Sequence, residues 1–269
     1  MGQAPKEWTK ILVPATRDRV MEYLEDSMAG EGSFMLQEYV EGIEMGIGAW
    51  FNGSKFLKPV LPNFKFNKMG SVVIYKDKNK LFTETLHKAS HVLAAENYVG
   101  FINLNCVITE NGPYALSWTT RFEYPTLPMQ DEIHKGDWGA FFMNVANAST
   151  PTFKSRKNNW CVGVAVVTLP WPTEVHSDRY KNMPIFVRGN ASHIHFSNMK
   201  MKRDDRVTAG SRGYIAVATG HGRDLDIAME YANKRAGQVT VDDSYYSNDI
   251  GVRLLGQLPT IKRWGYMSK

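Results

Sequence analysis

The sequence lacks a long apolar run. No apolar stretch in its 269 residues reaches the roughly 18 residues that a membrane-spanning helix needs. The first ten residues contain no apolar core of a signal peptide, and Lys6 stands where a myristoylation signal would have Ser or Thr. We therefore expect a cytoplasmic protein without a membrane partner.

Cysteine is scarce, and the common nucleophile motifs are missing. Cys106 and Cys161 both lie in apolar, strand-like stretches, so we interpret them as reduced, buried thiols. Neither has a histidine close in sequence, and there is no Gly-x-Ser-x-Gly elbow, so nothing supports nucleophilic catalysis. A Gly-x-x-x-x-Gly-Lys-Ser/Thr phosphate loop is also missing.

Neither sign of charge is in great excess. The net charge is +5 and the pI is near 9.0. The densest charged stretch, residues 200–206, holds four basic and two acidic side chains. We interpret it as a solvated loop. A nucleic-acid-binding patch is the alternative, but no recognisable binding module accompanies it, so nucleic acid is not an expected partner.

Apolar patterns of helical and strand period are mixed without regular alternation, which favours an α+β fold. We expect one helix that begins after Thr16 and runs to about residue 28. Further helices are expected over residues 78–97, 130–148, 224–235 and 250–258. The strands that we expect cover residues 33–40, 44–51, 70–75, 101–109, 114–118, 160–169, 194–196 and 214–219.

Two of these strands form the most informative stretch. Residues 101–109 and 114–118 are joined by Asn111-Gly112, which is typical of a tight β-hairpin turn of type I′. Ser117 and Thr119 alternate with Trp118, so they project to the opposite face from it. A functional site could lie there.

Three histidines stand in short patterns. His193 and His195 form a His-x-His pair on a predicted strand, which suits either a metal site or a polar strand face. His221 stands between two glycines before a predicted helix. That pattern predicts either an anion site at the helix start or a tight turn.

A further candidate is the acidic stretch of residues 37–44. It reads as a strand, a turn and a strand, and a backbone hinge of this kind can hydrogen-bond an adenine edge. Glu44 could then accept hydrogen bonds from ribose hydroxyls. Taken alone, the pattern equally fits a generic hairpin.

Four segments resemble one family. They are FMLQEYVEGIEM (34–45), YVGFINLNCVITENGPYALSWTTRFEYPT (98–126), GYIAVATGHGRDLDIAMEYANKRA (213–236) and DIGVRL (249–254). In this order and at these distances they resemble the phosphoribosylamine–glycine ligases of purine biosynthesis, in the ATP-grasp superfamily. The resemblance implies a partial ATP-grasp domain over residues 1–155, lacking its N-terminal part, and a ligase-like C-terminal domain over residues 156–269.

The resemblance also implies site residues. Gln37, Glu38 and Val40 match the adenine hinge, Glu44 matches the ribose-binding carboxylate, and Arg121 matches an arginine beside the phosphates. ATP and Mg²⁺ are the implied cofactors.

The metal positions depart from the family. Ser117 and Thr119 stand where the family has a metal-binding Glu and Asn, and Asn105 stands where many ATP-grasp enzymes have an acid. Because Mg²⁺ usually needs one or two carboxylates, the implied Mg²⁺ is doubtful.

Three hypotheses follow. The first is a degenerate, catalytically inactive ligase-like protein that serves as a structural or assembly component, for example of a virus particle, with Trp8, Trp171 and Trp264 as candidate contact residues. The second is an active ATP-dependent ligase, with its N-terminal half supplied by a separate chain. The third is a non-catalytic nucleotide-binding regulator. The expected partners are other protein chains.

Overall fold

The structure is a computed structural model that describes residues 16–27, 37–66, 68–155, 160–172 and 178–267. The chain divides into two compact units, Met1–Gly42 and Ile43–Lys269. None of the described helices is long and apolar enough to cross a membrane.

The first unit contains helix α1 (Arg17–Ser27), which confirms the helix predicted after Thr16. The hydroxyl of Thr16 accepts a hydrogen bond from the backbone N–H of Arg19 at 3.4 Å, as expected of a capping residue. Residues 37–40 form no strand, so the strand predicted over residues 33–40 is wrong in its described part. No other strand is described in this unit for them to pair with, which is the physical reason.

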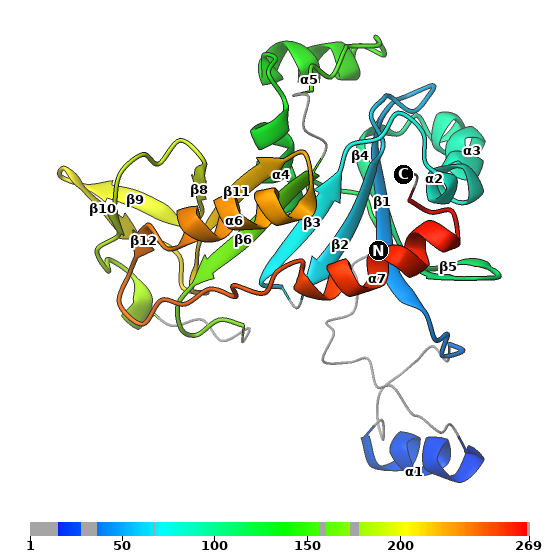
Figure 1. Ribbon diagram of the computed structural model, residues 1–269, viewed down its shortest axis with the longest axis horizontal. Coiled ribbons are helices and arrows are strands. Elements are labelled where there is room, and N and C mark those ends of the chain that lie inside the picture. Colours follow the sequence, from blue (N-terminus) through cyan, green and yellow to red (C-terminus); the bar gives the residue numbers. More distant parts are fainter. Residues whose placement is uncertain (1–15, 28–36, 67, 156–159, 173–177, 268–269) are drawn as a thin grey trace. The chain divides into compact units, whose positions relative to one another are not determined.

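The second unit is built around an eight-stranded antiparallel sheet with the order β5-β4-β1-β2-β3-β6-β11-β8 (Figure 1). Its strands are β1 (Ile43–Asn52), β2 (Leu61–Phe66), β3 (Gly70–Ile74), β4 (Val99–Thr109), β5 (Gly112–Thr119), β6 (Trp160–Val167), β8 (Ile194–Phe196) and β11 (Tyr214–Gly222). Two small sheets pair β9 (Met199–Lys202) with β10 (Asp205–Thr208), and β7 (Phe186–Val187) with β12 (Val239–Thr240). Because β3 pairs with β6, strands from both sides of the predicted division at residue 155 belong to one sheet. The division itself stays a prediction.

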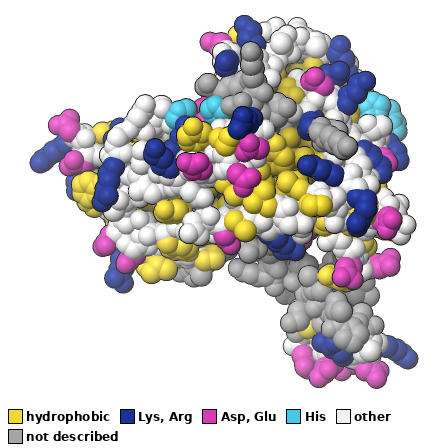
Figure 2. Space-filling model, viewed as in Figure 1, with side chains coloured by type: hydrophobic (Ala, Val, Ile, Leu, Met, Phe, Trp, Pro, Cys, Tyr) yellow, Lys and Arg dark blue, Asp and Glu magenta, His cyan; other side chains and the backbone are white. Residues whose placement is uncertain are grey.

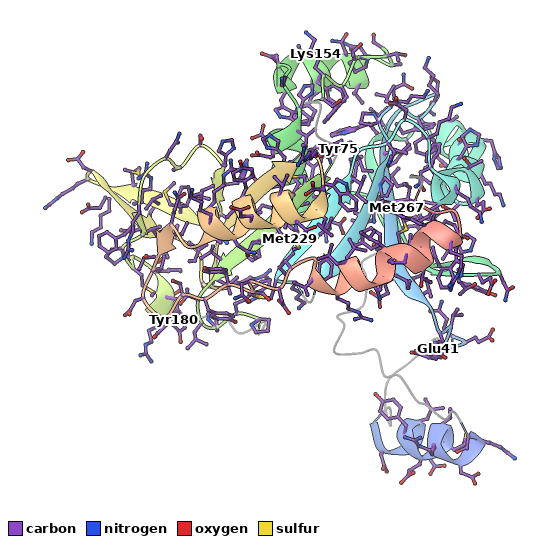
Figure 3. All side chains as sticks on the ribbon, in the orientation of Figure 1. Glu41, Tyr75, Lys154, Tyr180, Met229 and Met267 are labelled. Carbon is purple, nitrogen blue, oxygen red and sulfur yellow. The ribbon has the colours of Figure 1, made fainter. Side chains whose placement is uncertain are left out.

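Helices cover both faces of the sheet. They are α2 (Lys80–Glu84), α3 (Ser90–Ala95), α4 (Thr126–Ile133), α5 (Trp138–Ala146), α6 (Leu225–Ala236) and α7 (Val252–Arg263), with 3-10 helices η2 (Leu86–Ala89) and η3 (Asp178–Tyr180). On one face the core includes Ala228 of α6, Leu254 of α7 and Met267, and Met229 packs against this cluster (Figure 3). On the other face Met129 of α4 and Phe141 of α5 pack with Trp50.

Two of the long predicted helices are interrupted. The stretch 78–97 is divided into α2, η2 and α3, and the stretch 130–148 into α4 and α5. Side chains bond to the backbone at two of the divisions: the Thr85 hydroxyl donates to the Leu81 carbonyl where α2 ends, and Asp137 accepts from the N–H of Ala140 at 2.6 Å where α5 begins. Such local hydrogen bonds compete with a continuous helix.

The predicted hairpin is present as β4 and β5, but its turn differs. Thr109 pairs with Gly112, so Glu110 and Asn111 occupy the two central positions. Gly112 alone among these residues has a positive φ, of 141°, so the turn is not of type I′.

Residues 200–206 form the β9–β10 hairpin instead of a loop. On the described part of the visible face, basic and acidic side chains are interspersed (Figure 2). Cys106 and Cys161 are free and buried, as predicted.

Candidate functional site

Polar side chains from β2, β4 and β5 lie on one face of the sheet, the face that packs against α4 and α5. Alternation along each strand puts them there together with the apolar Trp50, Leu61 and Phe101. We define the polar face as Asn63 and Lys65 of β2, Asn103 and Asn105 of β4, Ser117 and Thr119 of β5, and Glu123.

A chain of amide hydrogen bonds crosses the polar face. Asn63 Nδ2 donates to Asn103 Oδ1 at 2.7 Å, and Asn103 Nδ2 donates to Asn105 Oδ1 at 3.0 Å. Asn105 Nδ2 donates to Ser117 Oγ at 3.0 Å, since these two residues are register partners in β4 and β5. Gly46 on β1 makes room for this chain, because a Cβ there would clash with the Asn63 amide.

One ion pair completes the polar face. The ammonium of Lys65 donates to Asn105 Oδ1 at 2.6 Å and is paired with Glu123 Oε1. Two buried oxygens, Asn63 Oδ1 and Glu123 Oε2, have no hydrogen-bond partner among the described residues.

The polar face does not suit the Mg²⁺ that the resemblance implies. Mg²⁺ is held through one or two carboxylates. Here Glu123 supplies the only carboxylate of the set, and Lys65 already neutralises it. Within the described parts of the chain, no group of three or more His, Cys, Asp or Glu side chains could hold a metal ion.

The other predicted site residues are spread over the chain. Glu44 is exposed on β1 and lies on the same sheet face as Gly46. Arg121 is exposed after β5, and its guanidinium donates to the Phe122 carbonyl at 3.2 Å. Gln37, Glu38 and Val40 belong to the first unit, where Gln37 and Glu38 are exposed and Val40 is half-buried. Their assignment to a nucleotide site stays a prediction.

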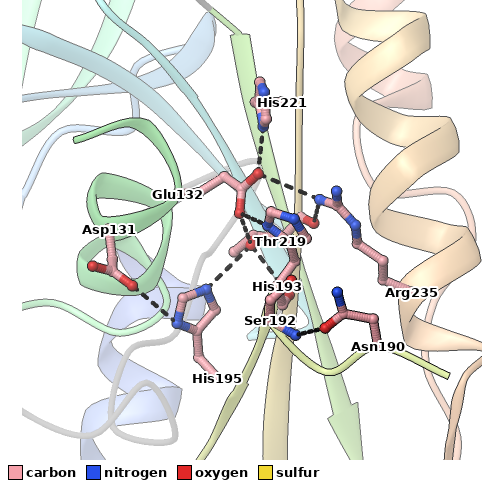
Figure 4. A network of polar contacts seen from close by, with 9 residues as sticks. All are labelled: Asp131, Glu132, Asn190, Ser192, His193, His195, Thr219, His221 and Arg235. Atoms are coloured by element: carbon pink, nitrogen blue, oxygen red, sulfur yellow. Dashed lines mark hydrogen bonds and ion pairs between the residues drawn. The ribbon is translucent and has the colours of Figure 1, made fainter. Parts of the chain in front are cut away.

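A second polar cluster surrounds Glu132 of α4 (Figure 4). Its side chain is 1% exposed and accepts hydrogen bonds from four groups. His193 Nδ1 lies 2.7 Å and the Thr219 hydroxyl 2.8 Å from Oε2. His221 Nδ1 and, at 3.4 Å, the Arg235 guanidinium reach Oε1. We call this set the Glu132 network.

The donors keep Glu132 ionised. Burial alone would raise its pKa, but the hydrogen bonds from His221, His193 and Thr219 together lower the pKa to about 2. His195 lies beside the network, with Nε2 3.2 Å from the Thr219 hydroxyl. Burial lowers the pKa of His195.

The Glu132 network bears on the hypotheses made for His193, His195 and His221. His193 turns Nδ1 to a carboxylate, and the Nδ1 of His195 lies 3.6 Å from Asp131, which favours the polar strand face over the metal site. Gly220, His221 and Gly222 lie within β11, so the pattern is neither a turn nor a loop before a helix. His221 also borders a cavity of about 470 Å³, whose lining residues are His221, Gly222, Arg223, Ile227, Tyr231 and Arg235.

Sequence reasoning missed Lys65, Glu123, Glu132 and Arg235. Each makes its decisive contact far along the chain: Lys65 with a residue 58 positions away, and Glu132 with partners 61 to 103 positions away. No local pattern could have found them.

The antiparallel sheet, which is covered by helices and carries the polar face, has the ATP-grasp fold. A phosphoribosylamine–glycine ligase from Thermotoga maritima matches with a TM-score of 0.62 at 19% identity, over 80% of this chain and 57% of that one. A phosphoribosylglycinamide synthetase from Anaerococcus prevotii matches with a TM-score of 0.53 at 15% identity, over 84% and 60%. A biotin carboxylase from Campylobacter jejuni, in complex with β-γ-ATP, matches with a TM-score of 0.55 at 11% identity, over 84% and 52%.

Among curated proteins, the chain is similar to the phosphoribosylamine–glycine ligase of Lactococcus lactis subsp. lactis (strain IL1403), at 19% identity over 253 residues and 86% of this chain. It spans 60% of that relative's length. No family model matches the chain. The predicted resemblance to the phosphoribosylamine–glycine ligases and the predicted α+β fold are confirmed.

Proposed function

We propose that the chain is a non-catalytic protein of ligase-like fold that serves as a structural or assembly component. The polar face carries the proposal. Its amides are hydrogen-bonded to one another and to Ser117, and its single carboxylate is paired with Lys65. ATP-dependent ligation needs a cation that neutralises the phosphates during transfer, and these residues leave no charge to hold one.

An assembly role is supported by the edge of the sheet. β5 is the outermost strand, and its side chains Tyr114, Leu116 and Trp118 are exposed, Trp118 by 45%. An exposed apolar edge strand is suited to pairing with another chain. The tryptophans suggested by the sequence serve less well. Trp264 packs against the core and Trp171 against Tyr214, while Trp8 lies outside the described residues.

The first test is turnover. With ATP, Mg²⁺, phosphoribosylamine and glycine, we expect no ADP formation above an enzyme-free mixture, because no metal is held at the polar face. The Thermotoga maritima ligase, assayed in parallel, is the positive control. ADP formation by the chain alone would overturn the proposal. Turnover only after adding the N-terminal half of a ligase as a separate chain would favour the split-enzyme hypothesis.

The second test is association. We expect light scattering after size-exclusion chromatography to show an oligomer, and Trp118→Ser to weaken it about tenfold or more, because an interfacial aromatic side chain contributes at least about 1.4 kcal/mol. Met143→Ser on α5 is the matched control, since Met143 is also an exposed apolar side chain, 62% exposed, but belongs to a helix and not to the edge strand. A wild-type protein that stays monomeric at high concentration and captures no partner chain would contradict the assembly role.

A further inference from the structure

The ammonium of Lys65 is held on the polar face by side-chain oxygens of Asn105 and Glu123. Amide and carboxylate oxygens are also the protein ligands of hard divalent cations. We infer that Lys65 is this chain's own replacement for the divalent cation that the resemblance implies, and that it keeps the polar face closed to such metals. The inference rests on the proposed function and deepens it.

The charges of the polar face balance without a metal. Glu123, with its side chain 10% exposed, supplies one negative charge, and Lys65 supplies one positive charge. The remaining members are neutral amides and hydroxyls. A divalent cation beside Lys65 would put like charges together in a partly buried place, where water screens them poorly. Glu44 does not alter this balance, because it is exposed and its register partner is Val107, outside the amide chain.

An oxygen of Asn105 and one of Glu123 both contact the cationic Lys65 ammonium. Asn105 Oδ1 accepts from both Lys65 and Asn103, so donors converge on it. Asn63 Oδ1 and Glu123 Oε2 are buried and have no hydrogen-bond donor among the described residues. A buried carboxylate needs a positive charge beside it, and Lys65 is the charge that the structure provides for Glu123. Removing that charge should therefore create a place for a metal ion.

The test compares Mn²⁺ binding by wild type and Lys65→Met, with free Mn²⁺ measured by electron paramagnetic resonance. Mn²⁺ takes the same oxygen ligands as Mg²⁺. We expect Lys65→Met to bind Mn²⁺ at least tenfold more tightly than wild type. Adding Asn105→Asp to this variant should tighten binding again, whereas Asn105→Asp alone should do so far less, because Lys65 still occupies the place.

Two controls separate this effect from nonspecific binding. Lys58→Met removes an exposed lysine elsewhere and should leave Mn²⁺ binding unchanged. Lys65→Met/Glu123→Gln removes both charges and should return binding to the wild-type level. Should Lys65→Met fail to fold, Lys65→Gln keeps N–H donors without the charge and should give the same gain, with circular dichroism checking the fold of each variant.

Equal Mn²⁺ affinity in wild type and the folded Lys65 variants would overturn the inference, whether that shared affinity is high or low. So would a gain that persists in Lys65→Met/Glu123→Gln. These outcomes are distinct from failure of the proposed function, which is judged by ADP formation. If the wild-type protein binds Mn²⁺ tightly but shows no turnover, the inference that Lys65 replaces the cation is wrong, whereas the proposed non-catalytic role stands.

Discussion

Replacing Glu132 with Gln should lower the free energy of unfolding by about 3 kcal/mol, which lies at the low end of the range for breaking a buried ion pair. The carboxylate is 1% exposed and receives donors from β11, from α6 and from His193 in the segment before β8. An amide leaves the Arg235 guanidinium without its counter-charge and offers one acceptor atom in place of two. Urea denaturation followed by circular dichroism measures the loss.

The same variant should change the pH dependence of stability. The pKa of Glu132 is lowered from 4.5 to about 2 in the folded protein, so the unfolded chain binds the proton more tightly. Its contribution is therefore full above about pH 4.5 and is lost as pH falls toward 2; at about 1.4 kcal/mol per pKa unit this amounts to about 3 kcal/mol. Wild type should lose this stability on acidification, and Glu132→Gln should show a flatter profile.

The matched control for Glu132→Gln is the neighbouring Asp131→Asn. Asp131 also lies on α4, but its side chain is 52% exposed and its oxygen lies 3.6 Å from His195. An exposed pair of this kind contributes about 1 kcal/mol or less. Equal losses in the two variants, or an unchanged acid profile in Glu132→Gln, would show that the network does not hold α4 to the sheet.

Much of the fold could be predicted because its signals are local. The apolar run of β6 is buried almost throughout, as expected for a strand in the middle of a covered sheet. The hairpin of β4 and β5 was predicted from alternation and a turn signal, and the polar face of β5 from the alternation of Ser117 and Thr119 with Trp118. The turn of this hairpin differs from the prediction. The Thr109 hydroxyl donates to the Gly112 carbonyl and accepts from the N–H of Asn111, which places Glu110 and Asn111 at the central positions.

The candidate site was predictable only in part, for a physical reason. Asn105 and Ser117 were named from the sequence, and they are indeed register partners. Lys65 on β2 neutralises their surroundings by pairing with Glu123. This pairing depends on the strand order of the sheet, in which two strands lie between β2 and β5. A short sequence pattern carries no information on such an order. The Glu132 network could not be predicted for the same reason, because its residues lie far apart in the sequence.

Gly220→Ala should be the most disruptive single-methyl change in β11. A Cβ at this position would approach the backbone carbonyl of Ala228 and the backbone N–H of Ala232 to less than 3.0 Å, closer than real Cβ atoms come. Both atoms belong to the backbone of α6 and cannot move aside as a side chain does. Overpacking of this kind costs about 3 kcal/mol, which urea denaturation would measure. The glycine is thus required by helix packing.

Gly256→Ala makes the same chemical change and should have the opposite sign. Gly256 lies inside α7, and a Cβ there meets nothing within 4 Å. Alanine is favoured over glycine in a helix interior by about 1 kcal/mol, so this variant should be more stable than wild type. If Gly220→Ala were as stable as wild type, α6 would not rest on β11 at this point. Since Thr219 and His221 flank Gly220 and both bond to Glu132, a displaced α6 should also loosen Arg235, and the flat acid profile of Glu132→Gln should then reappear in Gly220→Ala.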